Sequence, residues 1–413
     1  MMKDLEKLKI LKDMVSIDTQ DKNESEIADY ISTLFSKYDI QIEKVNVSDN
    51  RDNLLAYLGK GKKVLGVTGH MDVVSVGELD LWSHDPFDMV EKDGKLYGRG
   101  TSDMKSGLAA LVIAMIELKE ENVKLNGQVK LLATVDEEKN ETGAKKLVEE
   151  GFADDLDALI VAEPSGVSKE ALLQQKDNFE FSSSDLEKLL NNNKTNEQHF
   201  LIYAHNGSYD YKVTSIGKTA HSSMPHLGVN AIDNLMLYYN KQQEYFATSS
   251  KEKEDEVLGK IVPVNTIISG GEQINSVPSE AYLVGRIRTT PTQTGEMITK
   301  DLNKIIADLN TKEDVQLSLE VLNNQSPVKS DTNSEFIKLV KLLGSEYLEQ
   351  EYPLMHVAGG TDAATFIKAN PSLQVAVVGP GNNTSHMVDE FVDKDIFLKS
   401  IDFYKAVMKE YLN

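Results

Sequence analysis

Four apolar stretches in the first half of the chain constrain the fold more than any other feature. They read NLLAYLG, KVLGVTG, QVKLLATV and LDALIVAEP, and segments with helical periodicity, such as SGLAALVIAMIELKEE and GAKKLVEEG, lie between some of them. Strands that are apolar along almost their whole length are covered on both faces, and helical crossovers place helices there. The first half therefore predicts an α/β domain with a mixed, largely parallel sheet covered by helices.

From about Ser208 the pattern changes to that of a second domain. The expected elements follow the order strand, helix, strand, strand, helix, strand, which is typical of a ferredoxin-like α+β sheet with helices on one face. A helix, the strand LQVAVVGPG and a final helix then resemble the first domain resumed. We expect a discontinuous catalytic domain over 1–207 and 324–413, with an inserted βαββαβ domain over 208–323.

The segment 168–200 fits neither domain. It is polar and rich in asparagine, and Ser184 and Glu187 form a plausible capping box before Leu189 and Leu190. We expect a surface excursion that carries one short helix.

Composition excludes several classes of protein. A chain of 413 residues is too long for one compact core, and 44 basic against 66 acidic residues give a net charge of −22, which argues against nucleic acid or an anionic membrane as a partner. Because there is no cysteine, any metal must be bound by His, Asp and Glu. The N-terminal MMKDLEKLKILKDMV lacks an apolar signal core and no apolar run is long enough to cross a bilayer, so we expect a cytoplasmic protein.

Ionisable residues at the ends of the expected strands form a candidate site. His70 and Asp72 follow an apolar run and stand on one face of an extended chain, as a metal ligand and its orienting carboxylate do. Further ionisable residues follow expected strands or lie in Gly-rich loops: Asp103, Glu137, Glu138, Glu163 and His386. In open α/β sheets such positions meet at the carboxyl edge. Two histidines, several carboxylates and no sulfur suit a pair of divalent metals bridged by one carboxylate.

Each of these residues alone has an ordinary structural explanation. DEEK is commonly a solvated turn, a lone histidine in a loop commonly forms a hydrogen bond, and an aspartate after Gly-Thr-Ser commonly caps a helix. Their placement on successive edges of one sheet favours a metal site.

Longer motifs over nearly the whole chain resemble the M20 metallopeptidase and deacylase family. They are GHMDVV, LWSHDPFDMVEKDGKLYGRGTSDMKSGLAA, ATVDEEKNETGA, VAEPSG, GKTAHSSMPHLGVNAI, GGTDAATF and GPGNNTSHMVDE, in the order that the family has them. Within the family the chain is similar to the branch of succinyl-diaminopimelate desuccinylases and acetylornithine deacetylases.

This resemblance implies two divalent metal ions per chain, zinc first, with cobalt or manganese as alternatives. It implies that His70 and Glu163 bind one ion and that Glu138 and His386 bind the other. Asp103 would bridge the two ions. The inserted domain would serve as a lid and as the contact of a homodimer.

The resemblance also assigns roles around the metals. Glu137 would be the general base, Asp72 would orient the ring of His70, and a cis peptide bond would follow Asp103. His221 would stabilise the oxyanion, often in the active site of the partner subunit.

Substrate contacts are implied less uniquely. Arg288 matches the family's arginine for a substrate carboxylate, and Arg286, on the same strand face, is a competing candidate. Matching loops add Asn275, Gly360, Thr361 and Asn382 as candidate substrate-binding residues. Two features depart from the family: the length of 168–200, and Asn206, which stands where relatives often carry a basic residue.

The expected function is hydrolysis of the amide bond of an N-acyl amino acid by a di-metal enzyme. N-succinyl-diaminopimelate, cleaved to succinate and diaminopimelate, is the first candidate substrate, with acetylornithine deacetylation or a broad aminopeptidase or dipeptidase activity on short peptides as alternatives. From a different class, the chain could be a catalytically silent binding or regulatory member of the fold. The intact ligand set and Glu137 favour the enzyme.

Overall fold

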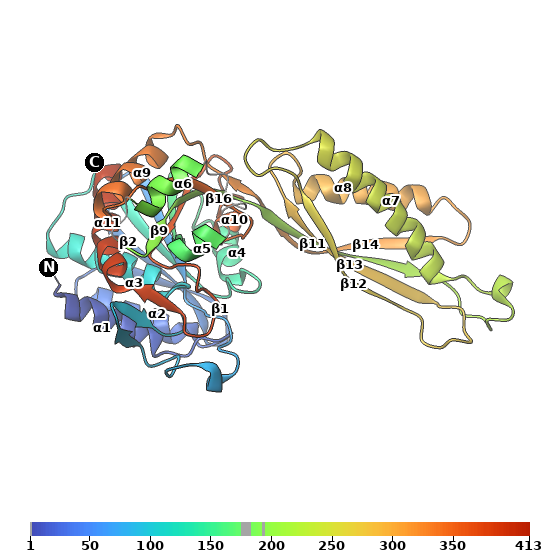
Figure 1. Cartoon of the computed structure of the whole chain (residues 1–413), viewed down its shortest axis with the longest axis horizontal. Coiled ribbons are helices and arrows are strands. Elements are labelled where there is room, and N and C mark those ends of the chain that lie inside the picture. The colour runs from blue at the N-terminus through green and yellow to red at the C-terminus, as the bar shows by residue number, and fades with distance from the viewer. Residues whose placement is uncertain (1, 175–182, 192–194) are drawn as a thin grey trace. The chain divides into compact units, whose positions relative to one another are not determined.

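The computed structural model describes residues 2–174, 183–191 and 195–413 (Figure 1). Contacts within the chain divide it into two compact units. Unit 1 comprises Met1–Tyr203, Ser330–Met355 and Thr361–Asn413, and unit 2 comprises Ala204–Lys329 and His356–Gly360. The chain thus leaves unit 1 at 204 and resumes it at 330, whereas the sequence predicted an inserted domain over 208–323.

Unit 1 is built on a mixed sheet with the order β1-β2-β6-β3-β7-β17-β10. Strands β6, β3, β7 and β17 pair in parallel, whereas β1 with β2, β2 with β6, and β17 with β10 pair antiparallel. The strands of this sheet are β1 (Gln41–Ser48), β2 (Arg51–Gly59), β3 (Val64–His70), β6 (Gln128–Thr134), β7 (Ala158–Pro164), β10 (Leu201–His205) and β17 (Gln374–Gly379). The shorter strands of unit 1 are β4 (Val90–Lys92), β5 (Lys95–Tyr97) and β18 (Phe391–Asp393), whereas β15 (Val328–Lys329) belongs to unit 2 and the boundary between the units falls within β16 (Leu354–Val357).

Helices cover this sheet as the apolar strands predicted. They are α1 (Asp4–Val15), α2 (Glu24–Ser36), α3 (Lys105–Glu120), α4 (Thr142–Glu149), α9 (Glu335–Tyr347), α10 (Ala363–Phe366) and α11 (Lys394–Leu412). Helix α3 is buried from Lys105 to Leu118 and packs on β3 and β7, with α1 and α11 against it. A Cβ atom at Gly107 would lie 2.0 Å from the carbonyl oxygen of Ala162, so only glycine allows this close approach of α3 to β7. None of the described helices combines the length and the apolar content that crossing a bilayer requires.

The segment 168–200 carries the expected short helix, but its start differs from the prediction. Helix α5 covers Lys169–Gln174 and helix α6 covers Ser183–Asn191. Ser184 therefore lies inside α6 and does not precede it, so the capping box was wrongly placed. The residues 175–182 and 192–194, over which the excursion was also expected, lie outside the described residues.

The end of this segment is not a surface excursion. Strand β9 (Glu197–His199) pairs with β8 (Gly166–Ser168), and all its residues are buried. The next residue, Phe200, packs with Leu172 and Leu189 in a small apolar cluster. The polar composition hid this burial, because the polar side chains of β9 bind partners inside the protein.

Unit 2 has the predicted βαββαβ order. Its elements are β11 (Gly207–Ile216), α7 (Ala231–Glu252), β12 (Val262–Gly270), β13 (Glu280–Thr289), α8 (Gly295–Leu309) and β14 (Gln316–Gln325). The sheet order is β12-β13-β11-β14, all antiparallel, and both helices pack on it (Figure 1). The core between them holds Tyr209, Tyr211, Leu235 and Ile298. The predicted fold class, α/β with an inserted α+β domain, is confirmed.

Candidate metal centre

The residues predicted to bind the first metal meet at the carboxyl ends of parallel strands. His70 is the last residue of β3, and Glu163 lies near the end of the neighbouring β7. The Nε2 atom of His70 is 3.1 Å from Oδ1 of Asp103 and 3.3 Å from Oε1 of Glu163. These three side chains therefore share one small space, as the expected first metal site requires.

The residues predicted to bind the second metal meet at the other oxygen of Asp103. The Nε2 atom of His386 is 3.0 Å from Oε2 of Glu138 and 3.4 Å from Oδ2 of Asp103. Each oxygen of the Asp103 carboxylate thus contacts a different histidine. This is the arrangement that a bridging carboxylate requires.

The ligand candidates differ in what holds their backbone. We call His70 and Glu163 the strand-held ligands, and Asp103, Glu138 and His386 the loop-held ligands. The side chain of His70 is 1% exposed and that of His386 is 54% exposed. The backbone of His386 has a φ of 64°, and a cis peptide bond follows Asp103, as the resemblance implied.

Asp72 connects the two kinds of ligand. Its carboxylate accepts hydrogen bonds from the backbone amides of Glu137 and Glu138, at 3.2 and 3.1 Å. Its carbonyl oxygen is 3.0 Å from Nδ1 of His70, whereas its carboxylate is 3.7 Å from that atom. The nearest partner of the ring is thus the Asp72 carbonyl, and the carboxylate fixes the loop that carries the two glutamates.

An excess of negative charge governs the electrostatics of the cluster. Burial lowers the pKa of His70, but the charges of Glu163 and Asp103 outweigh it and raise this pKa well above its usual range. Hydrogen bonds to Asp103 and Glu138 raise the pKa of His386 to about 10. Burial raises the pKa of Glu163 to about 7. A bound cation would neutralise the negative charge that raises the pKa of the two histidines.

The donor set fits metal ions by its chemistry. Atoms of His70, Asp103 and Glu138 lie within 4.8 Å of one another, as do atoms of His70, Glu137 and Glu163. The Oε1 atom of Glu138 is buried without a hydrogen-bond partner among the described residues. Nitrogen and oxygen donors without sulfur suit zinc, cobalt and manganese.

Comparison with known proteins places this cluster in a family. Peptidase family M20/M25/M40 matches residues 66–410. The chain belongs to this family. A probable succinyl-diaminopimelate desuccinylase of Staphylococcus aureus strain N315 is 38% identical, with 98% of both chains covered. The M20 chain is therefore an enzyme, a metal-dependent amidohydrolase with a metal-binding group of histidines and carboxylates.

Solved structures share the fold of this M20 enzyme. An M20 metallo-carboxypeptidase from Sulfolobus solfataricus is 18% identical with a TM-score of 0.73, covering 98% of this chain and 99% of that one. A dinuclear metal-binding peptidase of the M20 family from Bacillus subtilis is 14% identical with a TM-score of 0.67. The match covers 99% of this chain and 98% of that one.

A second group of carboxyl groups next to Glu137 was not found from the sequence. Oxygen atoms of Glu137, Glu141 and Asp362 lie within 4.8 Å of one another. Asp362 accepts a hydrogen bond from Thr134 at 2.6 Å, and burial together with Glu141 raises the pKa of its carboxyl group well above its usual range. The only signal in the sequence was that Glu141 and Asp362 fall inside the motifs ATVDEEKNETGA and GGTDAATF.

A buried ion pair of Arg99 and Glu390 was also not found from the sequence. Glu390 is the last residue of the motif GPGNNTSHMVDE, four residues after His386. Its carboxylate accepts a hydrogen bond from the amide of Asp103 at 2.8 Å. Arg99 and Glu390 are far apart in the chain, and no periodic pattern of residue types predicts a contact between them.

Within unit 2, the two candidate arginines of this M20 enzyme differ in their contacts. Arg286 donates two hydrogen bonds to the carboxylate of Asp210, at 2.7 and 2.8 Å. Arg288 has no side-chain hydrogen bond or ion pair within the described part of the chain. Burial and the charge of Arg286 lower the pKa of Arg288. Its guanidinium is the one available to a ligand.

His221 and Asn275 lie at the end of the unit 2 sheet opposite Arg288. His221 is exposed, pairs through its backbone with Ser276, and has Nδ1 2.8 Å from Oγ of Ser223. Arg288 is near the other end of β13, eight residues beyond the start of that strand at Glu280, or about 26 Å at the rise of an extended chain.

The remaining candidates occupy loops. Gly360 is exposed in unit 2, and Thr361 is buried in unit 1, where its hydroxyl accepts a hydrogen bond from Ala363. The Asn382 amide donates to Glu197 and Phe391 and accepts from Thr384.

Asn382 is 2% exposed, and both of its donors and its oxygen are used inside the protein. These contacts support the loop that precedes His386, and the role of Asn382 in substrate binding stays a prediction. Asn206, noted above as a departure from the family, is buried and donates to the carbonyl of Thr289 at 3.0 Å.

Proposed function

We propose that this M20 enzyme hydrolyses the amide bond of an N-acyl amino acid with two divalent metal ions, and that N-succinyl-diaminopimelate is its substrate. The observation that carries the reaction is the Asp103 carboxylate, whose oxygens contact His70 and His386 separately. The relative at 38% identity, named as a probable succinyl-diaminopimelate desuccinylase, supports the substrate.

The strand-held ligands His70 and Glu163 would hold one ion, and Glu138 and His386 the other, with Asp103 shared. The dinuclear M20 peptidase of Bacillus subtilis supports the count of two. Such ions lower the pKa of a water molecule and polarise the amide carbonyl. The donor set favours zinc first, with cobalt or manganese as alternatives.

Glu137 is the general base of the proposed reaction. It takes the proton of the attacking water and later delivers that proton to the nitrogen of the leaving amine, so that succinate and a free amine are released. Without metal ions, burial and the charge of Glu163 raise the pKa of Glu137 well above its usual range. The hydrogen bond from its amide to Asp72 holds the loop in place.

Arg288 binds a carboxylate of the substrate. A guanidinium can donate two parallel hydrogen bonds to a carboxylate, and succinyl-diaminopimelate offers several. Because Arg286 already makes this kind of contact with Asp210, Arg288 is the stronger candidate of the two.

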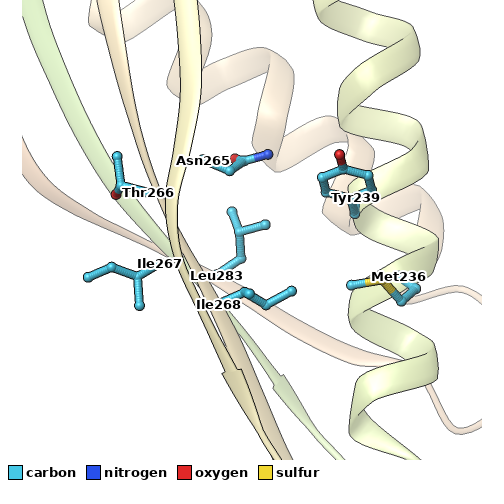
Figure 2. Close-up of a pocket in the computed structure, with 7 residues that line it drawn as sticks. All are labelled: Met236, Tyr239, Asn265, Thr266, Ile267, Ile268 and Leu283. Carbon is cyan, nitrogen blue, oxygen red and sulfur yellow. The ribbon is translucent and has the colours of Figure 1, made fainter.

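The enzyme forms a homodimer through unit 2. Strand β12 is an edge strand, and Val262, Val264, Ile267 and Ile268 on it are 55, 52, 52 and 61% exposed. Figure 2 shows Ile267 on the side of β12 away from Met236 and Tyr239 of α7. An edge strand offers unpaired backbone groups to a second copy, and apolar side chains would be buried there.

Opposite placement of His221 and Arg288 also supports the dimer. At about 26 Å along the strand direction, both side chains of one chain cannot contact the same small substrate. In a dimer, His221 of one copy and Arg288 of the other can contact the same substrate. Sedimentation of the wild-type enzyme tests this arrangement, and a monomer that is fully active would contradict it.

A panel of substrates tests the proposed activity. The enzyme loaded with zinc, cobalt or manganese is assayed on N-succinyl-diaminopimelate, N-acetylornithine and dipeptides, with Glu137→Gln as the control for contaminating hydrolases. We expect the highest kcat/KM on the succinyl substrate. If the enzyme prefers acetylornithine or a dipeptide, the proposed substrate is wrong and the proposed reaction still holds. If it hydrolyses none of these amides, a binding or regulatory protein is favoured.

A further inference from the structure

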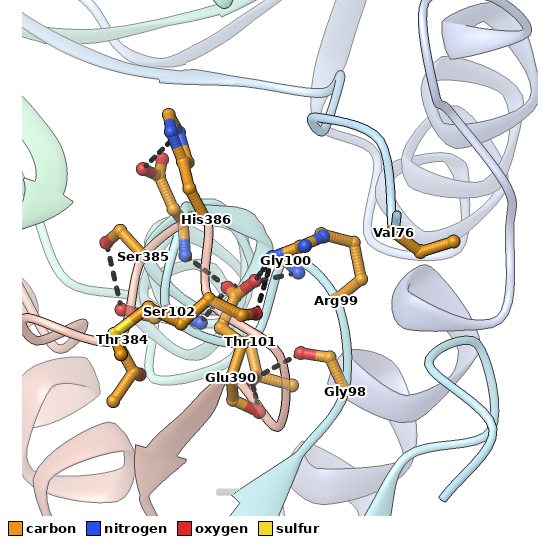
Figure 3. Close-up of polar contacts among 12 residues, drawn as sticks. Val76, Gly98, Arg99, Gly100, Thr101, Ser102, Thr384, Ser385, His386 and Glu390 are labelled. Atoms are coloured by element: carbon orange, nitrogen blue, oxygen red, sulfur yellow. Dashed lines mark hydrogen bonds and ion pairs between the residues drawn. The ribbon is translucent and has the colours of Figure 1, made fainter. Parts of the chain in front are cut away.

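Arg99 and Glu390 form a buried ion pair next to the loop-held ligands (Figure 3). Their side chains are 2% and 0% exposed, and Nη1 of Arg99 donates to Oε2 of Glu390. The guanidinium also lies over the ring of Trp82, with its central carbon 5.1 Å from the ring centroid. A buried pair of this kind is a poor source of stability, so its position calls for another explanation.

Glu390 holds the loop that leads to Asp103. Its Oε1 atom accepts hydrogen bonds from the backbone amides of Gly100, Ser102 and Asp103, at 3.1, 2.8 and 2.8 Å. These amides precede helix α3 and have no strand partner. Without Glu390 they would be buried donors without acceptors, so the path of the loop depends on this one carboxylate.

Arg99 holds the loop that carries His386. Its Nη1 atom donates to the carbonyl of Met387 at 3.3 Å, and Nη2 donates to the carbonyl of Ser75 at 3.1 Å. Met387 directly follows His386, and Ser75 lies three residues after Asp72. The pair thus connects the backbones of loops that are far apart in the chain.

We propose that Arg99 and Glu390 are positioning residues that hold Asp103 and His386 at the separation required by the cation between them. This inference rests on the proposed function, because it assumes a metal ion bound by His386, Glu138 and Asp103. The strand-held ligands need no such pair, since the backbone ladder of β3 and β7 fixes them. The pair therefore acts on the site of Glu138 and His386 through two ligands, Asp103 and His386, and on the other site only through the shared Asp103.

The substitution Glu390→Gln is the main test. Glutamine offers one acceptor oxygen and two N–H donors, so it cannot accept from the loop amides and from Arg99 together. We expect Co²⁺ binding at one of the two sites to weaken roughly 10–100-fold, as is typical for partners that orient metal ligands. Binding is followed by equilibrium dialysis and by the visible spectrum of bound Co²⁺, neither of which needs a substrate.

Glu117→Gln is the matched control. Glu117 has a side chain that is 0% exposed and pairs with Lys7 and Lys405, at 3.1 and 2.8 Å. It lies on α3, fourteen residues after Asp103, or about 20 Å along the helix. Both variants should lower the melting temperature, because both disturb a buried ion pair, but only Glu390→Gln should weaken Co²⁺ binding.

Excess Co²⁺ should also restore part of the lost kcat in Glu390→Gln, whereas it should not change Glu117→Gln. Two sites of wild-type affinity in folded Glu390→Gln would overturn the proposal. If Glu390→Gln does not fold, Arg99→Lys provides the same test, because lysine keeps the charge and loses the contacts to Met387 and Ser75. Unchanged Co²⁺ affinity in Arg99→Lys would also overturn the proposal. A wild type with fewer than two sites would instead contradict the proposed function.

Discussion

The strand-held and loop-held ligands reach the same cluster by different means. His70 and Glu163 are placed by parallel pairing of β3 with β7, and His70 is almost fully buried. Asp103 and His386 lie in loops, and the buried pair of Arg99 and Glu390 contacts the backbone of both. The edge of the sheet therefore positions the two strand-held ligands through backbone pairing alone. The loop-held ligands need other side chains that hold their backbone in place.

The largest expected effect is on kcat, in variants of the adjacent Glu137 and Glu138. Only Glu138 is a loop-held ligand, so the two variants should differ in metal content. In Glu137→Gln the nearly isosteric amide keeps both metals but cannot accept a proton, so kcat should fall roughly 10²–10⁴-fold. In Glu138→Gln one metal should be lost on dialysis, with activity partly restored by excess metal. Metal content and kcat are measured on both variants. Near-normal kcat in Glu137→Gln would refute the mechanism, and metal loss in that variant alone would exchange the two roles.

His70→Ala and His386→Ala test the division of ligands directly. Each should lose one tightly bound ion, with affinity at that site falling by more than the roughly 10–100-fold typical of indirect partners. Only His70→Ala should also lower the melting temperature strongly, because it removes a buried side chain, whereas His386 is half exposed. Elemental analysis after dialysis gives the number of metal ions bound per chain. Two ions retained in His386→Ala would remove that residue from the ligand set.

The substitution Arg288→Lys tests a candidate substrate contact in unit 2. Lysine cannot reproduce the two parallel hydrogen bonds of a guanidinium, and losing one bond to a charged group costs about 1.5–3 kcal/mol, so KM should rise roughly tenfold or more. Arg286→Lys is the control, since Asp210 already occupies that side chain. Steady-state kinetics decide between them, and impairment of Arg286→Lys alone would transfer the role to Arg286.

The smallest effect concerns the stability of the metal-free protein. The carboxylates raise the pKa of His386 to about 10, above the value of about 6.5 in an unfolded chain. Its ion pairs therefore stabilise the folded state fully below about pH 6.5, and this contribution is lost as the pH rises through about 10. The difference in unfolding free energy between wild type and His386→Ala should shrink over that range. Chemical denaturation at several pH values measures it, with the exposed His226→Ala as control, and a constant difference would contradict the prediction.

The sequence predicted the parts of this enzyme that depend on local pattern. Buried parallel strands such as β7 are apolar over most of their length, and a residue like Glu163 at the end of such a run is visible without a structure. Glu390 was missed because its partners Gly100 and Ser102 lie nearly three hundred residues earlier, and side chain to backbone contacts leave no periodicity. The burial of β9 was missed for a related reason: polar residues that find partners inside a protein look like surface residues in sequence.

The insertion of unit 2 into unit 1 has an evolutionary consequence. The proposed metal ligands and Glu137 all belong to unit 1, whereas the candidate substrate contacts Arg288, His221 and Asn275 belong to unit 2. If these three residues of unit 2 recognise the substrate as we propose, mutations that alter recognition can accumulate there and leave β3 and β7 unchanged. Selection can then preserve the residues of the chemistry in unit 1 while the residues of unit 2 diverge.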